Sequence, residues 1–357
     1  MISFVVLVLL IGGGIFGVSR INLTPRFEDR TDPVLDNLVE GIATRDALWV
    51  RGSSGKVVRI NRTTAERSLL AEDVIDILAD GQHLWALTKT SDDAWQVFDL
   101  RNPNGPAIPV TTDSAPIALF STSAGPGVLA SKTVLLSSDG DWKTLPLSEN
   151  FFERATILSP SDNALYVGYD HGEFGGGLRR IDLNDGGIAL IDDSEPDKLC
   201  SGLMNTSCDP VVGIVAAPEQ PDCVLAGISL WHLGMKQGRV ITACEQSLSA
   251  VFSHKLWSPL DTLNRLLGGH NQTWVFDSLT AVRNGWVATG ATRYARATHS
   301  ASAKPSKVKM SAYPRLKSLG GIQVSKEIDG VIFAEGSCCL HYDLYTQRIM
   351  IALPVMD

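Results

Sequence analysis

The segment VIDILADGQHLWALTKTSDDAWQVFDL (Val74–Leu100) contains the pattern that predicts the fold. Three short apolar runs are separated by polar turns, and apolar and polar residues alternate within the runs. This alternation is typical of strands with one buried face, so the segment predicts an antiparallel meander. Related units begin at Leu38 (LVEGIATRDALWVRGSSGKVVRINR), Arg154 (RATILSPSDNALYVGYDHGEFGGGLRRIDL) and Val211 (VVGIVAAPEQPDCVLAGISLWHLGMKQGRVITAC). The chain is therefore built from repeats of a short-strand unit.

The spacing of these repeats predicts a β-propeller. Second strands recur at intervals between 36 residues, from Trp49 to Trp85, and 61 residues, from Leu225 to Trp286. Such periods of short strands are typical of propellers, and no long helical periodicity competes with them. We predict an all-β protein with a single propeller of seven blades, each of four antiparallel strands, over residues 37–357. Six or eight blades stay open as alternatives because the third, sixth and seventh units are the weakest. The predicted second strands contain Trp49, Trp85, Leu129, Tyr166, Leu225, Trp286 and Ile332.

Two resemblances accompany this pattern. The stretch VIDILADGQHLWAL at residues 74–87 resembles the WD40-like repeats of periplasmic propellers in two-component sensors. The pieces GEFGGGLRRID (172–182), LCSGLMNTSCDPVVGI (199–214) and WHLGMKQGRVITAC (231–244) resemble an uncharacterised family of bacterial exported propeller proteins. The second resemblance covers about a fifth of the chain, and it implies a fold and export without implying an activity.

The amino terminus predicts export. ISFVVLVLLIGGGIFGV (Ile2–Val18) is apolar and uncharged, which is typical of a signal peptide or a short membrane anchor. No basic residue precedes it and no clear cleavage site follows it. We expect a signal peptide or membrane anchor at 1–20, a linker at 21–36 and the propeller from 37. The expected location is periplasmic or extracellular, with a membrane tether as the alternative to cleavage.

Cysteine usage agrees with an oxidising compartment, because six cysteines form an even set without CxxC pairs. Cys223 and Cys244 are expected to face each other across an antiparallel hairpin and to form a disulfide. Cys200 and Cys208 are expected to close a small loop. The adjacent Cys338 and Cys339 are expected not to bridge each other, because neighbouring strand residues point to opposite faces.

Composition and net charge limit the classes of partner and cofactor that the protein is expected to bind. The formal charge of −8 argues against nucleic acid and against adhesion to anionic lipid. With 44% hydrophobic residues in 357, the chain is long enough to fold without metals. Neither a thiolate metal motif nor a cofactor motif is present, so we predict no metal and no cofactor.

Candidate ligand-binding residues concentrate on one predicted face. In a blade with strands A (inner) to D (outer), the B–C turns and the D–A connections share a face. The insertions 194–210, 256–277 and 292–306 are all assigned to this face, the last as a B–C turn. Long loops on a rigid scaffold are common binding sites. The candidate residues there are Asp170, His171, Glu173, Arg179, His232, His270 and Arg293.

Each candidate has a simpler alternative. His171 and His232 fit part of a metal site, but no HxH or HExxH spacing supports one, and solvated loop histidines are the commoner case. Glu173 and Arg179 fit a polar ligand or a weak hairpin salt bridge. The three glycines at 175–177 fit a tight turn better than a phosphate site, because no helix is predicted to follow them.

The leading hypothesis is a non-enzymatic binding or scaffold module. It presents the loops of blades 4–6 to a protein, peptide or saccharide. The alternative is a propeller enzyme of hydrolase or lyase type, using His171, Glu173 and His232 on a small polar substrate. A quinone-dependent dehydrogenase is a third hypothesis, which rests only on the adjacent cysteines at 338–339. An enzyme would need several ionisable groups that converge on one substrate atom.

Overall fold

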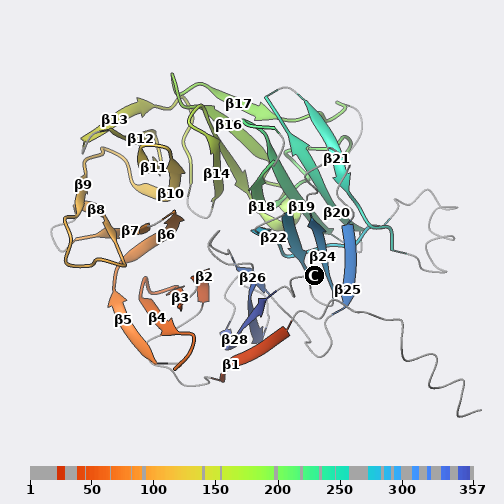
Figure 1. The fold of residues 1–357 in the computed structure, drawn as a ribbon. Helices are drawn as coiled ribbons and strands as arrows, with labels where there is room; N and C mark the ends of the chain where they lie inside the picture. The colour runs from red at the N-terminus through yellow and green to blue at the C-terminus, as the bar shows by residue number, and fades with distance from the viewer. Residues whose placement is uncertain are drawn as a thin grey trace, which may run out of the picture.

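A computed structural model shows four-stranded antiparallel sheets arranged as a ring (Figure 1). The structure describes residues 22–28 and 38–353. Gaps of three or more residues lie at 91–93, 197–199, 257–271, 299–307, 313–319, 323–330 and 338–344, and a few single or paired residues are also left out. The predicted leader at 1–20 lies outside the described residues.

Blades 1 to 3 each consist of four consecutive strands. Blade 1 contains β2 (Leu38–Ala43), β3 (Ala47–Gly52), β4 (Val57–Asn61) and β5 (Arg67–Ala71). Blade 2 contains β6 (Val74–Asp80), β7 (His83–Lys89), β8 (Trp95–Asp99) and β9 (Ile108–Val110). Blade 3 contains β10 (Pro116–Thr122), β11 (Gly125–Ala130), β12 (Thr133–Ser138) and β13 (Asp141–Pro146).

Blades 4 and 5 follow the same order, with longer connections between their strands. Blade 4 contains β14 (Ala155–Ser161), β15 (Ala164–Tyr169), β16 (Leu178–Asp182) and β17 (Ile188–Ile191). A short 3-10 helix, η1 (Gly172–Phe174), lies between β15 and β16. Blade 5 contains β18 (Val211–Ala216), β19 (Val224–His232), β20 (Met235–Ala243) and β21 (Leu248–Phe252).

The prediction of seven blades was wrong, because the structure has five complete blades. Blades 1 to 5 are the five complete blades, because strand order and side chains are described through each of them. Two further four-stranded sheets follow, and side chains are described only in part in the first and not at all in the second. The first is β22 (Ser278–Val282), β23 (Gly285–Thr289), β24 (Arg293–Thr298) and β25 (Val308–Ala312). The closing sheet is β26 (Gly320–Ile322), β27 (Val331–Ser337), β28 (Tyr345–Leu353) and β1 (Asn22–Glu28).

The closing sheet also differs from the others in how it is assembled. Its outer strand, β1, comes from the range 21–36 that was expected to be a linker, and pairs antiparallel with β28. A blade from consecutive strands within 37–357 was expected, so this part of the prediction was wrong. The inner strands contact one another around the ring, and β26 contacts β2. The two ends of the chain therefore join in one sheet and close the propeller.

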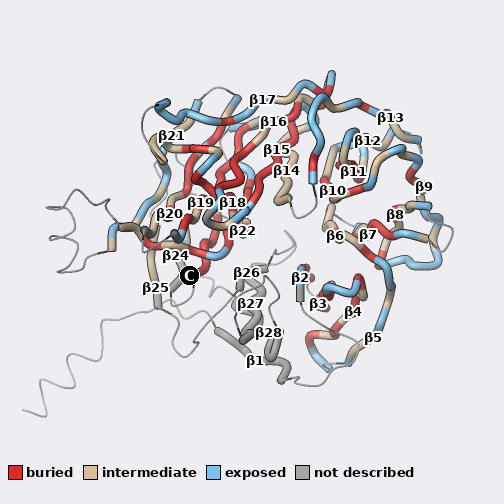
Figure 2. The backbone as a smooth tube through the Cα atoms, turned by 180° about the vertical axis from the view of Figure 1, so that it is seen from behind, coloured by how far each residue is buried: buried red, intermediate tan, exposed pale blue. Residues whose placement is uncertain are grey.

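The core lies between neighbouring blades. Apolar residues of blades 1 to 5 pack against the neighbouring blade. Figure 2 shows where the buried segments of the chain lie. Trp49 and Trp286 are buried on second strands, as predicted, while Trp85 is partly buried against the cluster between blades 2 and 3. Each predicted second-strand residue lies on the second strand of its sheet. Local alternation therefore located the second strands correctly.

Carboxylates join the inner strands of blades 1 to 3. The Glu40 Oε2 atom on β2 accepts a hydrogen bond from the backbone N–H of Ile77 at 3.3 Å, and one from Arg51 Nε at 3.0 Å. Asp76 Oδ2 on β6 accepts the backbone N–H of Leu119 on β10 at 2.5 Å. Glu40 and Asp76 each follow an irregularity in the A–B pairing. These irregularities turn the carboxylates toward the neighbouring blade.

No helix among the described residues has both the length and the apolar character needed to cross a membrane.

Candidate functional site

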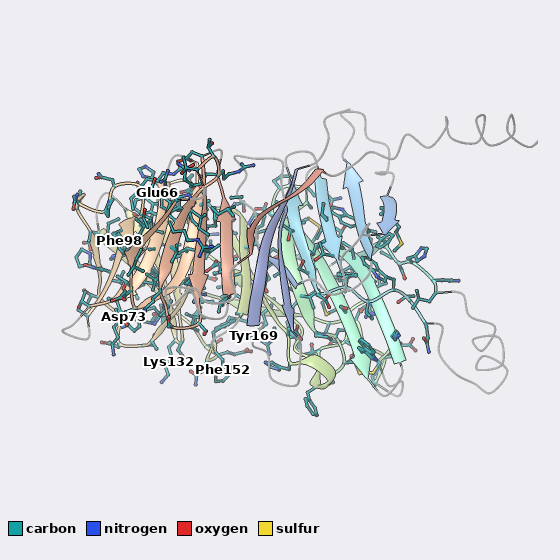
Figure 3. The ribbon with its side chains drawn as sticks, turned by 90° about the horizontal axis from the view of Figure 1, so that it is seen from below. Glu66, Asp73, Phe98, Lys132, Phe152 and Tyr169 are labelled. Atoms are coloured by element: carbon teal, nitrogen blue, oxygen red, sulfur yellow. A yellow bond between two sulfur atoms is a disulfide. The ribbon has the colours of Figure 1, made fainter. Side chains whose placement is uncertain are left out.

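The B–C turns and D–A connections form one face of the propeller, which we call the loop face. In the side view of Figure 3, Asp73, Lys132, Phe152 and Tyr169 lie toward this face, and Glu66 lies toward the opposite face. Asp73 and Phe152 belong to D–A connections, Lys132 belongs to a B–C turn, and Glu66 belongs to a C–D turn. The positions of these residues in the figure thus agree with the faces that the strand order assigns to their turns and connections.

The turn at residues 170–177 is the most elaborate described B–C turn on this face. It leaves β15, forms η1 and returns through three glycines to β16. All three glycines have positive φ, at +82°, +144° and +78°. A Cβ on Gly176 would collide with the carbonyl of Tyr169, and one on Gly177 would lie 2.7 Å from Thr206. The glycines therefore shape a turn that packs against another loop, and only glycine fits there.

That other loop is the D–A connection at 192–210. The backbone N–H of Gly176 donates to the carbonyl oxygen of Thr206 at 3.0 Å, and that of Gly177 donates to the carbonyl oxygen of Asp209 at 3.0 Å. Two aspartates order the same loop, because Asp192 accepts the N–H of Thr206 at 2.8 Å and Asp193 accepts that of Met204 at 2.7 Å. The turn and the loop therefore form one hydrogen-bonded unit.

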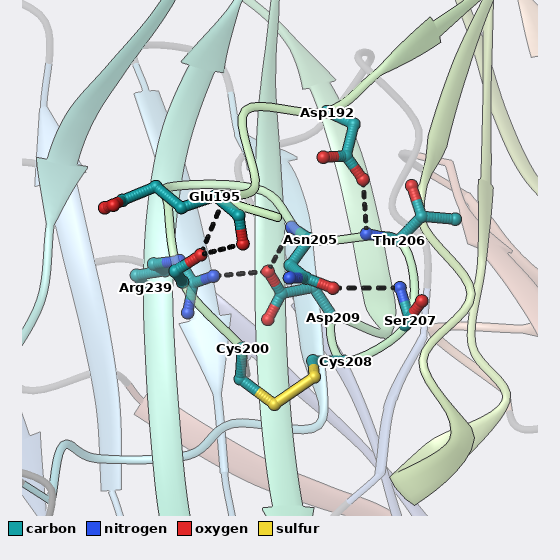
Figure 4. The surroundings of a disulfide bond; sticks show 10 residues. Asp192, Glu195, Cys200, Asn205, Thr206, Ser207, Cys208, Asp209 and Arg239 are labelled. Atoms are coloured by element: carbon teal, nitrogen blue, oxygen red, sulfur yellow. Dashed lines mark hydrogen bonds and ion pairs between the residues drawn. A yellow bond between two sulfur atoms is a disulfide. The ribbon is translucent and has the colours of Figure 1, made fainter. Parts of the chain in front are cut away.

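Figure 4 shows the disulfide inside this unit. Cys200 and Cys208 are bonded, with 5.4 Å between their Cα atoms. Beside them, Asp209 accepts the N–H of Asn205 at 2.7 Å and pairs with Arg239 of β20. Burial raises the pKa of Asp209 to about 6, although the charge of Arg239 acts in the opposite direction. The connection is thereby fixed to blade 5 by a buried ion pair.

Both predicted disulfides are present. Cys223 and Cys244 are bonded with a Cα separation of 4.5 Å, next to the Val224–Ala243 pair of the β19–β20 hairpin. This bond lies at the A–B end of blade 5, away from the loop face. Cys338 and Cys339 lie outside the described residues.

The predicted site residues are brought together only in part. The Tyr169 ring lies 5.6 Å from the His171 ring, and the Arg179 guanidinium lies 5.5 Å from the Tyr169 ring. Arg179 Nε also lies 3.4 Å from Glu149 of the connection between blades 3 and 4. Asp170 Oδ1 accepts the N–H of Gly172 at 2.8 Å. These three predicted residues therefore cluster on blade 4.

The other predicted residues are described less fully. Glu173 belongs to η1 and His232 is the last residue of β19, but their side chains lie outside the described set. His270 also lies outside it. Arg293 is the first residue of β24, and its side chain is not described.

One prediction about the insertions was wrong. Residues 292–306 were expected to be a long B–C turn, but 293–298 form the third strand of their sheet. The chain between β24 and β25 therefore connects the third strand of the sheet to the fourth, and is not a B–C turn. The alternation in RYARAT was overlooked because its small and charged residues resemble loop composition. The insertions 194–210 and 256–277 do connect fourth strands to first strands, as predicted.

Sequence reasoning missed the exposed aromatic residues of the loop face. Phe174 of η1 is 76% exposed, Phe152 is 65% exposed and Trp231 at the end of β19 is 64% exposed. η1 contacts β19, so Phe174 and Trp231 belong to adjoining elements. The backbone N–H of Phe152 donates to the Tyr169 hydroxyl at 3.0 Å, which connects it to blade 4. Trp231 ends the apolar run VLAGISLW and so had a local sequence signal, whereas Phe152 and Phe174 stand among polar residues and glycines and had none.

The opposite face carries a shallow hollow of about 530 Å³ between blades 1 and 2. Its polar groups already interact, because Arg59 pairs with Asp46 at 2.7 Å and lies 5.6 Å above the Trp49 ring. Across the described residues, no three or more His, Cys, Asp or Glu side chains are grouped so as to hold a metal ion.

Comparisons with known proteins identify the fold class. No family model and no curated protein matches the chain. A structure of U3-55K matches 92% of this chain and 100% of its own, with a TM-score of 0.52 and 9% identity. The WD40 repeats of RRP9 match 93% of this chain and 99% of their own, with a TM-score of 0.53 and 9% identity. At such identities the likeness shows the fold alone, which is a β-propeller.

A third structure relates to the first predicted resemblance. It is the extracellular domain of the putative hybrid two-component system BT4673 from B. thetaiotaomicron. It matches 92% of this chain and 39% of that chain, with a TM-score of 0.52 and 10% identity. The resemblance to sensor propellers is thus confirmed at the level of the fold. The resemblance to the uncharacterised exported family stays a prediction.

Proposed function

We propose that the protein is a non-enzymatic binding module that engages a protein or peptide through the loop face of blades 4 and 5. The observation that carries this proposal is the exposure of Phe152, Phe174 and Trp231 on that face. Aromatic side chains are enriched in the centres of protein interfaces, where they contribute much of the binding energy. Isolated exposed apolar residues are common, but here three large exposed rings share one face, and Phe174 and Trp231 lie on elements that contact each other.

The way these rings are held supports the same function. Phe174 is carried by a turn whose shape depends on three glycines and on the loop at 192–210. Trp231 extends from the nine-residue strand β19, and the Lys236 ammonium of the facing strand lies 4.7 Å from its ring. Pre-ordered side chains lose less entropy on binding than mobile ones, so such a face is suited to recognition. The enzyme hypothesis gains no comparable observation.

We further propose that the protein acts outside the cytoplasm. Its two disulfides support this, because disulfides persist mainly in exported proteins and are rare in the cytosol. The apolar stretch at residues 2–18 supports export by sequence.

Site-specific photo-crosslinking in the producing cells tests the binding face. A photoreactive phenylalanine analogue replaces Phe152, Phe174 or Trp231, and a matched control variant carries it at Glu66 on the opposite face. Crosslinks to a protein partner are expected from the three aromatic positions and not from position 66. The captured partner is then purified and its Kd is measured against wild type, Phe174→Ala and Trp231→Ala.

Each alanine variant is expected to weaken binding at least tenfold, since truncation of a central aromatic residue commonly costs about 2 kcal/mol. Equal crosslinking from position 66, or an unchanged Kd in both alanine variants, would refute the proposal.

A further inference from the structure

The segment that its disulfide closes, residues 200–208, supports the turn that carries Phe174. We call this segment the disulfide loop. The backbone N–H of Gly176 donates at 3.0 Å to the carbonyl oxygen of Thr206, which lies inside the disulfide loop. The backbone N–H of Gly177 donates at 3.0 Å to the carbonyl oxygen of the residue that directly follows the loop. Both hydrogen bonds between the turn and the connection therefore end in or next to the disulfide loop.

The contact between the turn and the disulfide loop is also close. A Cβ on Gly175 would lie 2.4 Å from the carbonyl oxygen of Thr206, and one on Gly177 would lie 2.7 Å from the Thr206 side chain. The turn can pack in this way only while Thr206 keeps its position. The shape of the turn consequently depends on the shape of the disulfide loop.

The backbone of Cys200 indicates that the disulfide helps to set this shape. Cys200 has a φ of +52°, a conformation that residues other than glycine rarely adopt. Such a conformation persists where the surrounding structure enforces it, and the bond to the buried Cys208 is one constraint of that kind. Without the bond, the chain at Cys200 is expected to relax and the disulfide loop to open.

The blades beneath the disulfide loop do not depend on it to the same extent. Met204 is the buried residue that the loop contributes to the core between blades 4 and 5. The other buried members of that core all lie on strands of these two blades. The propeller is therefore expected to fold with the two cysteines in either redox state, whereas the order of the turn depends on the bond.

We propose, building on the binding function above, that formation of the Cys200–Cys208 disulfide completes the binding face. In the reduced chain the propeller is folded, but the turn that carries Phe174 is not fixed. Oxidation orders the disulfide loop, and the loop then orders the turn. Because disulfides form mainly in exported proteins, the face becomes competent to bind only after the chain has left the cytosol.

The oxidation is a thiol–disulfide exchange. The thiols of Cys200 and Cys208 each lose one proton and one electron as the S–S bond forms. A disulfide-bearing oxidant, either a small molecule such as oxidised glutathione or an oxidoreductase, takes up both protons and both electrons. Its own S–S bond breaks in the same exchange, and it leaves as two thiols.

Amide hydrogen exchange tests this inference, because exchange at Gly176 and Gly177 reports how often their hydrogen bonds to the connection open. Exchange at these two residues is resolved by mass spectrometry with electron-transfer fragmentation. The proteins compared are wild type, Cys200→Ser/Cys208→Ser, and the matched control Cys223→Ser/Cys244→Ser, which lacks the disulfide of the β19–β20 hairpin instead.

In Cys200→Ser/Cys208→Ser, both glycine amides are expected to exchange about tenfold faster or more, because the entropy of closing the loop now opposes their hydrogen bonds. Amides within β15 and β16 are expected to keep their protection, and the control variant is expected to keep slow exchange at both glycines. Wild-type exchange rates in Cys200→Ser/Cys208→Ser, or equal acceleration in the two variants, would overturn the inference.

Reoxidation of the unsubstituted protein provides a second test if the serine variant folds poorly. Wild type is reduced with a dithiol and then oxidised with oxidised glutathione, while peptide mapping follows each disulfide. Protection of Gly176 and Gly177 is expected to return together with the Cys200–Cys208 bond. Full protection of these amides in the reduced protein would contradict the proposal.

Photo-crosslinking separates this inference from the proposed function. With the photoreactive analogue at position 174, Cys200→Ser/Cys208→Ser is expected to yield about fivefold less crosslinked partner than the control variant. If position 174 crosslinks equally in both, the inference is wrong and the binding function stands. If wild type crosslinks from none of its aromatic positions, the binding function is wrong, and the exchange rates alone decide whether oxidation orders the turn.

Discussion

Blades 1 to 3 and blades 4 to 5 repeat the same four strands but are joined by different means. In the first group, Glu40 and Asp76 reach from one inner strand to the backbone of the next. In the second group, the connection at 192–210 crosses the loop face and binds the turn at 170–177. The contacts between inner strands add nothing to the loop face, whereas the contacts of the 192–210 connection form part of that face. Joints placed on a surface can thus shape that surface as well as stabilise it.

The B–C turns of blades 3 and 4 show the contrast most directly. In blade 3 only Ser131 and Lys132 lie between the strands. In blade 4 eight residues fill the same place, with three glycines at positive φ, and they expose the ring of Phe174. Gly loses much conformational freedom on folding, so such a turn is costly unless its shape is used. The predictions below test this contrast.

The largest effect is expected from Gly176→Ala. The new Cβ would clash with the carbonyl of Tyr169, at a φ of +144° that L-residues rarely adopt. We expect a loss of about 3 kcal/mol in the free energy of unfolding, or misfolding of the turn. Chemical denaturation measures it. The control is Gly81→Ala, at φ +55° with nothing within 4 Å, which is expected to cost only about 1 kcal/mol. Equal costs would show that the turn is not closely packed.

The joint in blades 1 to 3 is expected to respond to pH. Desolvation, and next the charge of Glu40, raise the pKa of Asp76 well above its ordinary value. The folded state therefore favours the protonated acid, so this contribution to stability is full below about pH 4 and is lost as pH rises toward the folded pKa. Asp76→Asn lacks this loss. Between pH 4 and 8, the unfolding free energy of this variant is expected to fall by about 1–2 kcal/mol less than that of the wild type.

Urea denaturation across that pH range measures the difference, with Asp113→Asn as the exposed control. An identical pH dependence in Asp76→Asn and wild type would contradict the prediction.

A smaller global effect is expected from Cys200→Ser/Cys208→Ser. The closed segment is short, and the chain-entropy model gives about 2–3 kcal/mol for such a loop. Most of this is expected to order the loop itself, so proteolysis at residues 194–210 rises while Tm changes little. Limited proteolysis with mass spectrometry locates the cleavage. Cleavage at the wild-type rate would show that the hydrogen bonds of Asp192 and Asp193 suffice.

The smallest effect on stability is expected from Phe174→Ala. The ring is 76% exposed, so its removal is expected to change the unfolding free energy by less than about 0.5 kcal/mol. Phe151→Ala serves as the comparison, because that ring is buried and its loss is expected to cost about 3 kcal/mol or more. A large destabilisation by Phe174→Ala would mean that the ring supports the fold rather than a partner.

Local patterns predicted much of this molecule. Residues such as Leu129 and Tyr166 were placed on second strands because strand alternation is visible within a few residues. The bond between Cys223 and Cys244 followed from hairpin geometry alone. Both kinds of inference depend on neighbours that are close in the sequence.

The features that were missed depend on distant neighbours. Arg179 finds Glu149 thirty residues away, and Arg239 finds Asp209, also thirty residues away. β1 becomes a strand only by pairing with β28 at the other end of the chain. No local pattern in NLTPRFE marks it as part of a blade. Long-range pairing therefore set the limit of the sequence analysis, both in the fold and at the site.

The position of β1 also determines which face of the propeller would lie nearer a membrane to which the N-terminal segment was attached. As the outermost strand of the closing sheet, β1 runs from the opposite face toward the loop face, where the chain continues into blade 1. Whatever precedes Asn22 consequently joins the propeller at the face away from Phe174 and Trp231. If residues 1–20 hold the protein on a bilayer, the disc rests with its opposite face toward the lipid. The loop face with its exposed aromatic residues then points away from the bilayer.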